Sequence, residues 1–573
     1  MTKRVLGLLL VAAMLMSGFA IAQETQTATG TSKGYGGDVT VTLTVTDNKL
    51  TEVSAQGAQE TANVGTVALS ELPEKMLRTN SVDVDIVAGA TVTSNAVIAA
   101  AKAALAAAGI QETALAPLAD EAATQAESMT ADVIVIGGGG AGLAAGIAAT
   151  DESKTVIVLE RLAVLGGNTA LSGGVITRAG IPGDPEGTMS ADELYDYYMK
   201  ETGGKPDPDV VRTYVDQSAD TMAWAHSQGS GVAETTRYRV TPETIMSLQP
   251  ATDRGYGLIN PMAEGLRAAG GQILMNTLAT DLIVEDGKVI GVKAINADGQ
   301  QQEFYANGGV VIATGGFPAS TELLKKYSSI GAERATPLCS VGTDGSGLVM
   351  AEAIGADVKF GDDWDSIGTN SELTAPYKEA FPQLVALMVN DSGNRFLSED
   401  AQRPTIYKTM LHQLAEGANG FFFLFDKNTI GTGVEAFIEE GSAFQADSIE
   451  ELADQIGVPA DALLTTVARY NEQKGQDDAD FNKPAKFMLG LSEAPFYAAK
   501  TWPVRTSTIG GLVTDVDAHV LDTQGQPIPG LFAAGEVANY SFFHSVYATC
   551  GSAVGHAIIY GRIAGTNAAK LVD

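Results

Sequence analysis

The sequence predicts an α/β protein built around a Rossmann-like dinucleotide-binding domain, with a small α+β module in front of it. Residues 132–160 read as a buried strand, a glycine-rich turn, a helix of small residues and a second buried strand, which is the order of a βαβ unit. Residues 34–53 alternate polar and apolar side chains around Asp47 and Asn48, as a β-hairpin does. An alanine-rich helical stretch follows this hairpin and ends at Gly109.

The first 22 residues predict a cleaved secretory signal peptide. Lys3 and Arg4 precede an apolar run from Val5 to Met16, and Ala20-Ile21-Ala22 forms an A-x-A cleavage site. The apolar run is too short for a membrane-spanning helix. We therefore expect an exported mature chain that is secreted, periplasmic or held at the cell surface.

The composition of the chain disfavours several classes of binding partner. The chain of 573 residues has 36 basic and 69 acidic residues and a net charge of -33, which disfavours binding to nucleic acid or anionic lipid. Its two cysteines, Cys339 and Cys550, are far apart, and neither they nor the five histidines show the spacing of a metal site or of c-type haem attachment. We expect no metal, and whether the two cysteines pair stays open.

The small module is expected to span residues 30–112, and the polar, acidic and alanine-rich segment 113–130 reads as a linker. Within the module, residues 85–94 (DIVAGATVTS) place small residues and hydroxyl groups directly before the alanine-rich helix. One interpretation of this stretch is a plain strand-turn-helix. The other is a site where a hydroxyl carries a covalent flavin.

The glycine-rich turn after residue 136 predicts dinucleotide binding. Gly137, Gly139 and Gly142 supply G-x-G-x-x-G: the first allows the turn, the second lets the backbone approach a pyrophosphate, and the third lets the helix pack on the strand. The helix N-terminus then faces the phosphates. Glu160 ends the second strand, where an acid can bind a ribose hydroxyl.

The segment after this acid indicates which dinucleotide is bound. Residues 160–174 (ERLAVLGGNTALSGG) hold two further glycine pairs, with Asn168, Thr169 and Ser172 between them. Such a loop offers backbone amides and hydroxyl groups to a phosphate and a flavin ring, which is more than a nicotinamide site needs. The alternative is an ordinary glycine-rich surface loop.

In these motifs the chain resembles the fumarate reductase and flavocytochrome c group of FAD-dependent oxidoreductases, particularly exported urocanate-reductase-like members with an N-terminal FMN-binding domain. The resemblance covers essentially the whole mature chain. Besides GGGGAGLAA and GGNTALSGG, its motifs are GGVVIATGGF (308–317), GTDGSGLVMAEAIGA (342–356), VNDSGNRFLSE (389–399), GLFAAGEV (530–537) and GRIAG (561–565).

The resemblance implies a Rossmann-like FAD-binding domain in two parts, 131–362 and 503–573, interrupted by an α+β capping domain at 363–502 and preceded by the FMN-binding domain. Substrate is expected between the cap and the flavin ring. The residues implied to bind FAD without a covalent link are Gly137, Gly139, Gly140, Ala141, Gly142, Glu160, Gly167, Asn168, Thr169, Ser172, Gly173, Gly174, Ala279, Thr314, Gly315, Gly535, Glu536, Ser552 and Ala553.

In such relatives a flavin transferase attaches FMN, through a phosphoester, to the last threonine of a D-x-x-(S/T)-G-A-T pattern. This chain offers Asp85-x-x-Ala88-Gly89-Ala90-Thr91, with alanine in place of the usual hydroxyl residue. The resemblance therefore implies covalent FMN on Thr91. Thr93 and Ser94 are alternative acceptors, and an unmodified turn is the remaining interpretation.

The resemblance also implies the catalytic residues of a C=C reductase. Such relatives use an arginine four residues after the glutamate of R-F-x-N-E as proton donor; counting from Glu399 gives Arg403. The alternative is a surface arginine paired with Glu399 or Asp400. A relay glutamate upstream corresponds to Glu379, or else this residue is a solvated helix acid, and the arginine that follows it in fumarate reductases is replaced by Pro382.

The groups that hold the second carboxylate of fumarate in such relatives are missing, because their places fall near Gly368, Thr506 and Ala548. Arg505 is a candidate to hold one carboxylate, and His544 and Tyr547 are candidates to contact a ring or a carbonyl, unless both pack near the flavin. The expected substrate is thus a monocarboxylic enoate of the urocanate or aryl-acrylate type rather than fumarate.

Two other functions stay open at this point. The uncharged, aromatic segment YSFFHSVY (540–547) would suit an FAD-dependent ketosteroid-type dehydrogenase, and an exported flavin electron carrier would need no substrate site. Against the carrier stand the complete cap and the positioned arginine. Electrons are expected from a membrane-bound or external donor, because no haem motif and no second nucleotide fingerprint is visible.

Overall fold

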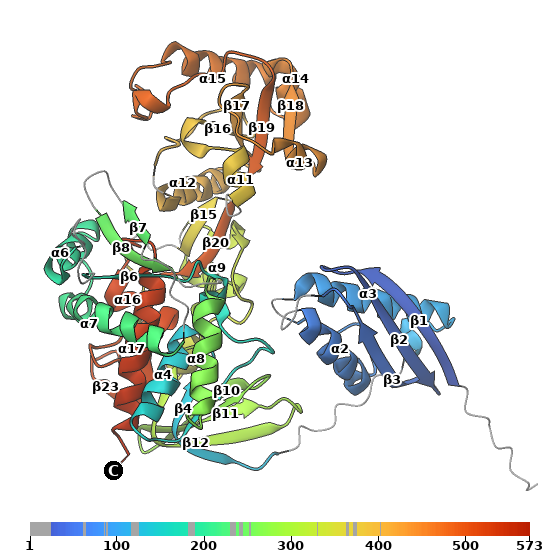
Figure 1. Ribbon diagram of the computed structural model, residues 1–573, viewed down its shortest axis with the longest axis vertical. Helices are drawn as coiled ribbons and strands as arrows, with labels where there is room; N and C mark the ends of the chain where they lie inside the picture. Colours follow the sequence, from blue (N-terminus) through green and yellow to red (C-terminus); the bar gives the residue numbers. More distant parts are fainter. Residues whose placement is uncertain are drawn as a thin grey trace, which may run out of the picture. The chain divides into compact units, whose positions relative to one another are not determined.

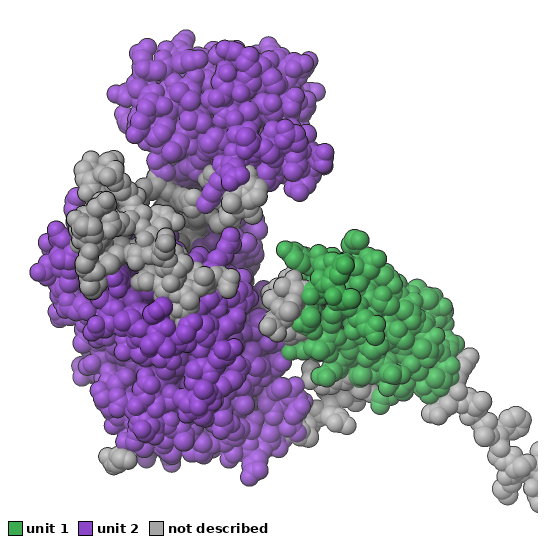
Figure 2. Space-filling model, in the orientation of Figure 1, with its two compact units in different colours: residues 1–124 green, residues 125–573 purple. Residues whose placement is uncertain are grey.

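The computed structural model divides the chain into two compact units, residues 1–124 and 125–573 (Figure 2). The structure describes residues 25–60, 65–84, 86–87, 90–115, 125–180, 189–229, 236–239, 245–250, 254–328, 330–361, 366–370, 375–401 and 403–572. The expected signal peptide, residues 1–22, lies outside these ranges, so it stays a prediction. In the described part of the chain, no helix combines the length and the apolar character needed to span a membrane.

The first unit is a three-stranded antiparallel sheet in the order β1-β2-β3, together with two main helices (Figure 1). Its elements are β1 (Thr25–Lys33), β2 (Asp38–Thr46), β3 (Lys49–Gln56), α2 (Gly65–Thr79), α3 (Thr91–Ala107) and the short η1 (Glu112–Ala114). The expected hairpin is confirmed: Asp47 and Asn48 join β2 to β3 with φ of 50° and 61°, the positive values that a tight two-residue hairpin turn requires.

The alternating pattern of β2 separates the two faces of this sheet. Val39, Val41 and Leu43 are fully buried, whereas the threonines between them face outward and hydrogen-bond across to threonines of β1, as in Thr29–Thr42 at 3.0 Å. Helix α3 approaches β1 so closely that a Cβ on Gly30 would lie 2.2 Å from the carbonyl oxygen of Ala100. The apolar face of the sheet is thus covered by helix.

The second unit is built on a sheet in the order β10-β11-β12-β4-β5-β9, with β23 also paired to β12 and β22 to β23. Its strands are β4 (Met129–Ile136), β5 (Val156–Leu159), β9 (Gln272–Leu274), β10 (Leu278–Glu285), β11 (Lys288–Ile295), β12 (Gln301–Ile312), β22 (His519–Leu521) and β23 (Pro527–Ala533). Strands β12, β4, β5, β9 and β23 run parallel, so their carboxyl ends share one edge of the sheet.

Helices α4 (Gly140–Asp151) and α17 (Ser552–Ala569) pack closely against each other beside this sheet. A Cβ on Gly561 would lie 2.3 Å from the carbonyl oxygen of Ala141, and one on Gly565 would lie 2.0 Å from that of Ala145. The motif GRIAG therefore permits backbone contact between the first and last helices of the dinucleotide domain.

The second unit has further helices and strands outside the expected cap segment. They are α5 (Gly167–Leu171), β6 (Val175–Arg178), α6 (Ala191–Glu201), α7 (Pro208–Ser227), β7 (Thr236–Arg239), β8 (Ile245–Pro250), α8 (Tyr256–Ala268), α9 (Thr321–Tyr327), η2 (Ala332–Arg334), β13 (Thr336–Pro337), α10 (Ser346–Glu352), β14 (Val358–Lys359), β21 (Gly511–Leu512), η5 (Gly535–Val537) and α16 (Tyr540–Phe543). Strand β6 pairs with β8, which pairs with β7.

A separate four-stranded antiparallel sheet, β16-β17-β19-β18, lies inside the segment expected to form the cap. The elements of this segment are β15 (Ser366–Asn370), α11 (Ala375–Ala380), η3 (Gln383–Val385), β16 (Leu387–Asn390), α12 (Arg403–Ala415), β17 (Phe421–Asp426), α13 (Val434–Glu439), β18 (Ala443–Ala446), α14 (Ile449–Ile456), α15 (Ala460–Glu472), η4 (Ala485–Phe487) and β19 (Phe496–Thr501). Strand β20 (Pro503–Thr508) pairs with both β15 and β13. The residue bounds of the expected domains remain predictions.

A buried histidine makes the second unit sensitive to acid. His556 on α17 is 3% exposed and packs on the rings of Phe542 and Tyr560, at centroid distances of 5.0 and 4.7 Å. Burial lowers its pKa from 6.5 to about 3. Between about pH 6.5 and pH 3 the unfolded chain therefore binds a proton at this histidine that the folded chain does not. The free energy of unfolding decreases as the pH falls through this range.

We expect the free energy of unfolding to fall by about 2 kcal/mol more between pH 7.5 and pH 5 in the wild type than in His556→Phe. Urea unfolding of the FAD-loaded protein at the two pH values measures this difference. Equal pH dependence in the two proteins would show that His556 is protonated to the same extent in the folded and unfolded states.

Candidate active site

Four of the residues expected to bind FAD lie at the shared carboxyl edge of the parallel strands. Gly137 directly follows β4 and Glu160 directly follows β5, while Thr314 and Gly535 each lie two residues beyond the ends of β12 and β23. Ligands of open α/β sheets bind at this edge. The topology therefore gathers four separate sequence motifs into one site.

The glycine-rich turn has the geometry that a pyrophosphate needs. Gly137 adopts a φ of 106°, which a side chain rarely allows, and a Cβ on Gly142 would lie 1.9 Å from the carbonyl oxygen of Gly137. A Cβ on Gly139, by contrast, would meet only the carbonyl oxygen of Gly166, at 3.7 Å. The open side at Gly139 and the N-terminus of α4 fit a bound dinucleotide phosphate.

Glu160 holds this turn in place. Its carboxylate accepts hydrogen bonds from the backbone N–H of Gly138 at 2.7 Å and of Leu162 at 2.8 Å. Burial raises the pKa of Glu160, and these backbone hydrogen bonds oppose the shift. The expected contact with a ribose hydroxyl remains a prediction beside this observed structural role.

Hydrogen bonds of the Asn168 and Glu536 side chains connect loops of the expected FAD site. Asn168 accepts from the backbone N–H of Ser340 at 2.8 Å and donates to the Glu536 carboxylate at 2.9 Å. Glu536 also accepts from the backbone N–H of Thr508 at 2.8 Å. Burial raises the pKa of Glu536. Both side chains therefore join loops that are far apart in the sequence, a role that the motifs alone did not reveal.

Asn539 was not among the expected residues, although it lies two positions after the motif G-E-V. Its carboxamide accepts from the backbone N–H of Gly510 at 2.7 Å and donates to the carbonyl oxygen of Thr508 at 3.0 Å. It is 2% exposed. An asparagine two positions after a functional motif was the available signal for this residue.

Most of the remaining expected FAD residues lie at the starts of helices or in loops, and one lies in a strand. Ser172 donates to the carbonyl oxygen of Thr169 at 2.7 Å and accepts from the backbone N–H of Gly174 at 3.1 Å. Ala279 is buried in β10. Gly140 and Ala141 open α4, Gly167 opens α5, Ser552 and Ala553 open α17, and Gly173 and Gly315 lie in loops.

The expected FMN attachment site lies at the start of α3. Thr91 is the first residue of that helix, where free backbone N–H groups favour a phosphate. The structure does not describe the side chain of Thr91, and Asp85, Ala88 and Gly89 lie outside the described residues. Thr93 is buried and donates to the Glu60 carboxylate at 2.6 Å, and buried Ser94 accepts from the backbone N–H of Val87 at 3.0 Å. The two alternative acceptors are thus already engaged.

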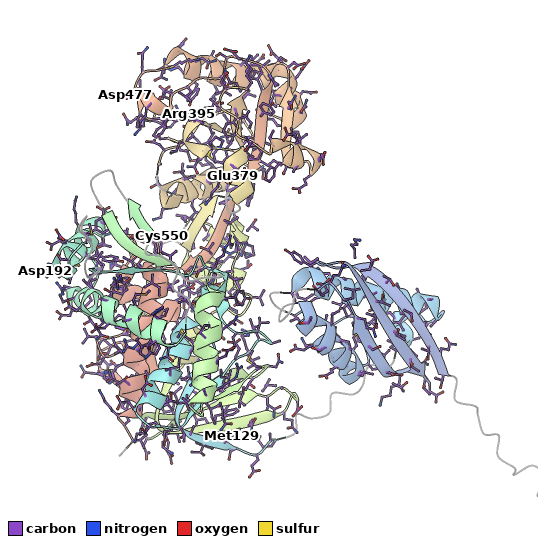
Figure 3. All side chains as sticks on the ribbon, viewed as in Figure 1. Met129, Asp192, Glu379, Arg395, Asp477 and Cys550 are labelled. Atoms are coloured by element: carbon purple, nitrogen blue, oxygen red, sulfur yellow. The ribbon has the colours of Figure 1, made fainter. Side chains whose placement is uncertain are left out.

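Arg403 opens α12, and its side chain lies outside the described part of the structure. Glu399, four residues earlier, is fully buried and paired with Arg395 and Lys483 at 2.8 and 3.0 Å. Glu399 is therefore already paired, and the alternative of an Arg403–Asp400 pair stays untested. Glu379 is exposed on α11 (Figure 3).

Arg505 has a structural role instead of the expected substrate contact. It is 3% exposed, and its guanidinium donates to the carbonyl oxygens of Pro318 at 2.6 Å, of Glu333 at 3.2 Å and of Ala335. These backbone carbonyl groups accept hydrogen bonds from guanidinium N–H groups that a substrate carboxylate would otherwise need. Holding a substrate carboxylate therefore does not fit the geometry of Arg505.

His544 and Tyr547 lie in the loop between α16 and α17. His544 has a φ of 54° and a ψ of -81°, a strained backbone for a residue with a side chain, and its ring lies 5.2 Å from that of Tyr540. The Tyr547 hydroxyl accepts from the backbone N–H of Gly551 at 3.0 Å, and burial raises the pKa of Tyr547. Strain of this kind is common at functional sites, but substrate contact by either residue stays a prediction.

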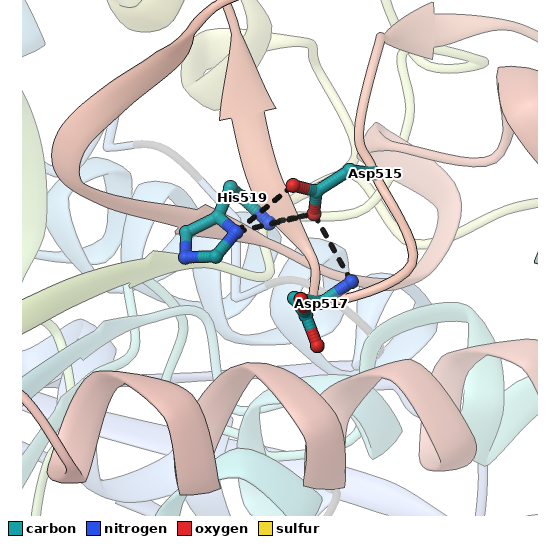
Figure 4. A group of neighbouring side chains, drawn as sticks. All are labelled: Asp515, Asp517 and His519. Atoms are coloured by element: carbon teal, nitrogen blue, oxygen red, sulfur yellow. Dashed lines mark hydrogen bonds and ion pairs between the residues drawn. The ribbon is translucent and has the colours of Figure 1, made fainter.

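Two other features of the structure are possible binding sites, namely a cluster of potential metal ligands and a cavity. Asp515, Asp517 and His519 bring potential metal ligands within 4.8 Å of one another (Figure 4). However, Asp515 accepts from the backbone N–H groups of Asp517 at 3.0 Å and His519 at 2.9 Å, so the turn itself accounts for the cluster. A cavity of about 220 Å³ lies beside Arg395 and Arg469, and none of the residues that line it is expected to bind FAD.

Comparison with protein families agrees with the geometry of both units. A family described as FAD binding domain matches residues 132–554, and one described as FMN-binding domain matches residues 34–106. The expected FAD and FMN cofactors therefore each have a recognised domain.

Individual relatives cover most of the chain. It is 31% identical to a urocanate reductase of Eggerthella lenta over 96% of this chain and 93% of that protein. It is 30% identical to an NADH:acrylate oxidoreductase of Vibrio harveyi over 95% of this chain, which spans 61% of that longer relative.

Two solved structures are also similar. The open conformation of a flavocytochrome c3 fumarate reductase matches with a TM-score of 0.66 at 27% identity, covering 78% of this chain and 79% of the other. A 3-ketosteroid-Δ4-(5α)-dehydrogenase from Rhodococcus jostii matches with a TM-score of 0.61 at 27% identity, covering 78% and 98%.

Proposed function

The chain belongs to the FAD-binding oxidoreductases of the fumarate and urocanate reductase family and carries an FMN-binding domain, and from this premise we propose that it reduces the activated C=C bond of an α,β-unsaturated carboxylate. In this proposal Arg403 is the proton donor and Thr91 carries FMN. When bound, FAD supplies the hydride that one alkene carbon receives.

The observation that carries the proposal is the state of Glu399 beside Arg403. Glu399 is buried and paired with Arg395 and Lys483, so this carboxylate, four residues before Arg403, is already occupied. An arginine at the start of a helix, where Arg403 lies, suits the binding of an anionic substrate. Relatives named for urocanate and acrylate support the same substrate class.

Arg403 has two tasks in this mechanism. Its guanidinium attracts the substrate carboxylate and stabilises the negative charge that develops as hydride arrives. It then gives a proton to the second alkene carbon, which completes the CH–CH product. The exposed carboxylate of Glu379 on α11 is suited to the solvent end of the path that returns this proton.

The proposed substrate is a monocarboxylate, with urocanate or an aryl-acrylate favoured over fumarate. Three positions where a second carboxylate would be held are occupied by Gly368, Thr506 and Ala548, and none of these carries a positive charge. Arg505, the nearest cation in sequence to Thr506, is committed to backbone carbonyls. A dicarboxylate would therefore bury an unpaired charge.

We also propose that the mature protein is exported and receives electrons from a membrane-bound or external donor through FMN, after a flavin transferase has attached it. The apolar N-terminal segment with its A-x-A site supports export. A covalently attached flavin cannot be lost by diffusion outside the cell.

A ketosteroid-type dehydrogenase is the second candidate function. The match to the Rhodococcus jostii enzyme favours it, as do the aromatic residues of α16 and the loop after it. Against it stand the FMN-binding domain and the higher identity to enoate reductases.

Steady-state assays with reduced viologen as electron donor separate these functions. We expect a kcat/KM for urocanate or a cinnamate at least about tenfold above that for fumarate, since one unpaired buried charge costs at least that factor. A preference for fumarate would contradict the proposed substrate class. Turnover with an unsaturated ketone alone would favour the steroid-type dehydrogenase.

A further inference from the structure

Four charged side chains are buried together in the cap. Arg395 is 7% exposed, and the side chains of Lys483, Glu399 and Asp478 are not exposed at all. Arg395 pairs with both Glu399 and Asp478, at 2.8 and 2.7 Å, and Lys483 pairs with Glu399 at 3.0 Å. The two positive charges balance the two negative charges, as buried ions require.

Glu399 has no room for another donor. One carboxylate oxygen accepts from Arg395 Nε at 3.0 Å and from the backbone N–H of Met388 at 2.9 Å. The other oxygen accepts from Arg395 Nη2 at 2.8 Å and lies 3.0 Å from Lys483 Nζ. A carboxylate offers about four lone-pair positions, and all of them are filled.

Lys483 is held with equal completeness. Besides its ion pair with Glu399, its ammonium donates to the carbonyl oxygen of Ala386 at 2.6 Å and to the hydroxyl of Tyr470 at 2.9 Å. These three acceptors match its three protons. Burial lowers the pKa of Lys483, and the Glu399 carboxylate opposes this shift.

This network lies next to the proposed proton donor along the chain. Glu399 precedes Arg403 by four residues, and its own backbone carbonyl accepts from the Gln383 side chain at 2.7 Å. An unsatisfied carboxylate at this position, four residues before the start of α12, would be a strong acceptor for an arginine guanidinium. Whether Glu399 is saturated therefore bears on whether Arg403 is free for substrate.

We propose that Lys483 is a positioning residue of the reaction: by filling the last lone pair and neutralising the remaining charge of Glu399, it keeps that carboxylate from capturing Arg403. This inference rests on the proposed function, because it assumes that Arg403 donates the proton. Lys483 itself touches neither substrate nor flavin in this account.

The test compares three variants of the FAD- and FMN-loaded enzyme with the fastest enoate among fumarate, urocanate and the cinnamates. Lys483→Met keeps the length of the side chain and removes its charge, so kcat should fall by on the order of tenfold to a hundredfold, as misplacement of a catalytic group does. KM should rise as well, because Arg403 also attracts the substrate carboxylate. The double variant Lys483→Met/Glu399→Gln removes the unbalanced charge and should recover most of that loss.

The recovery distinguishes positioning from a merely structural role, because the double variant breaks more hydrogen bonds than the single one. Arg469→Met is the matched control: Arg469 also lies in the cap and pairs with Asp480 at 3.0 Å, but its side chain is 53% exposed. It should leave kcat unchanged.

A wild-type kcat in Lys483→Met would overturn the inference, and so would a double variant slower than the single one. If Lys483→Met does not fold, a double variant that folds with bound FAD and a low kcat overturns it equally. Either result leaves the proposed function standing as long as Arg403→Ala is inactive. An active Arg403→Ala would remove the proposed function instead.

Discussion

Arg403→Ala is expected to lose enoate reduction by on the order of a thousandfold or more, because it removes both the proton donor and the charge that stabilises the transition state. The variant should still contain FAD, since the residues around the glycine turn at Gly137 come from other strands. The measurement is kcat with urocanate and reduced viologen, with the flavin content determined from the absorption spectrum.

Arg403→Lys is the informative companion variant. Lysine keeps the positive charge but not the planar fork that binds a carboxylate through two hydrogen bonds. We expect it to retain part of the binding and little of the proton transfer, so kcat should fall more than KM rises. If the activity of Arg403→Ala is near that of the wild type, a residue other than Arg403 donates the proton.

Thr91→Ala is expected to abolish covalent FMN. The protein, produced together with a flavin transferase and then denatured, should show flavin fluorescence on a gel for the wild type and none for the variant. Its FAD content should be unchanged, because FAD belongs to the other unit. Reduction of enoates by a donor that depends on FMN should fall to background.

Thr93→Val and Ser94→Ala are the matched controls for this variant. Both hydroxyl groups are buried and already hydrogen-bonded, to Glu60 and to the backbone of Val87, so neither is presented to a transferase. Both variants should keep the covalent flavin, at some cost in stability. Fluorescence that persists in Thr91→Ala and disappears in Thr93→Val would show that FMN is attached to Thr93 instead of Thr91.

The elements with strong local patterns were predictable from the sequence. The hairpin at Asp47-Asn48 and the βαβ unit around Gly137 follow from strand alternation and from glycine at positions of unusual backbone geometry. Four motifs were also expected to meet at one site, and the structure places Gly137, Glu160, Thr314 and Gly535 at one edge of the sheet.

The long-range polar contacts were not predictable. Arg505 was a candidate to hold a substrate carboxylate because the sequence does not show that the carbonyl oxygens of Pro318 and Ala335 converge on this residue. Lys483 lies in a segment without a recognisable motif, yet it completes the hydrogen bonds of Glu399. Periodicity and motifs report local conformation, whereas these partners depend on how distant loops pack.

Anaerobic reoxidation of the reduced, FMN-loaded protein tests most directly whether the chain reduces enoates. The reduced flavins are mixed with fumarate, urocanate, cinnamates or an unsaturated ketone, and the return of flavin absorbance is followed. We expect rapid reoxidation by one monocarboxylic enoate, with the saturated acid as product, and slow reoxidation by fumarate. Flavins that stay reduced with every acceptor would contradict the proposed reductase and favour an electron carrier.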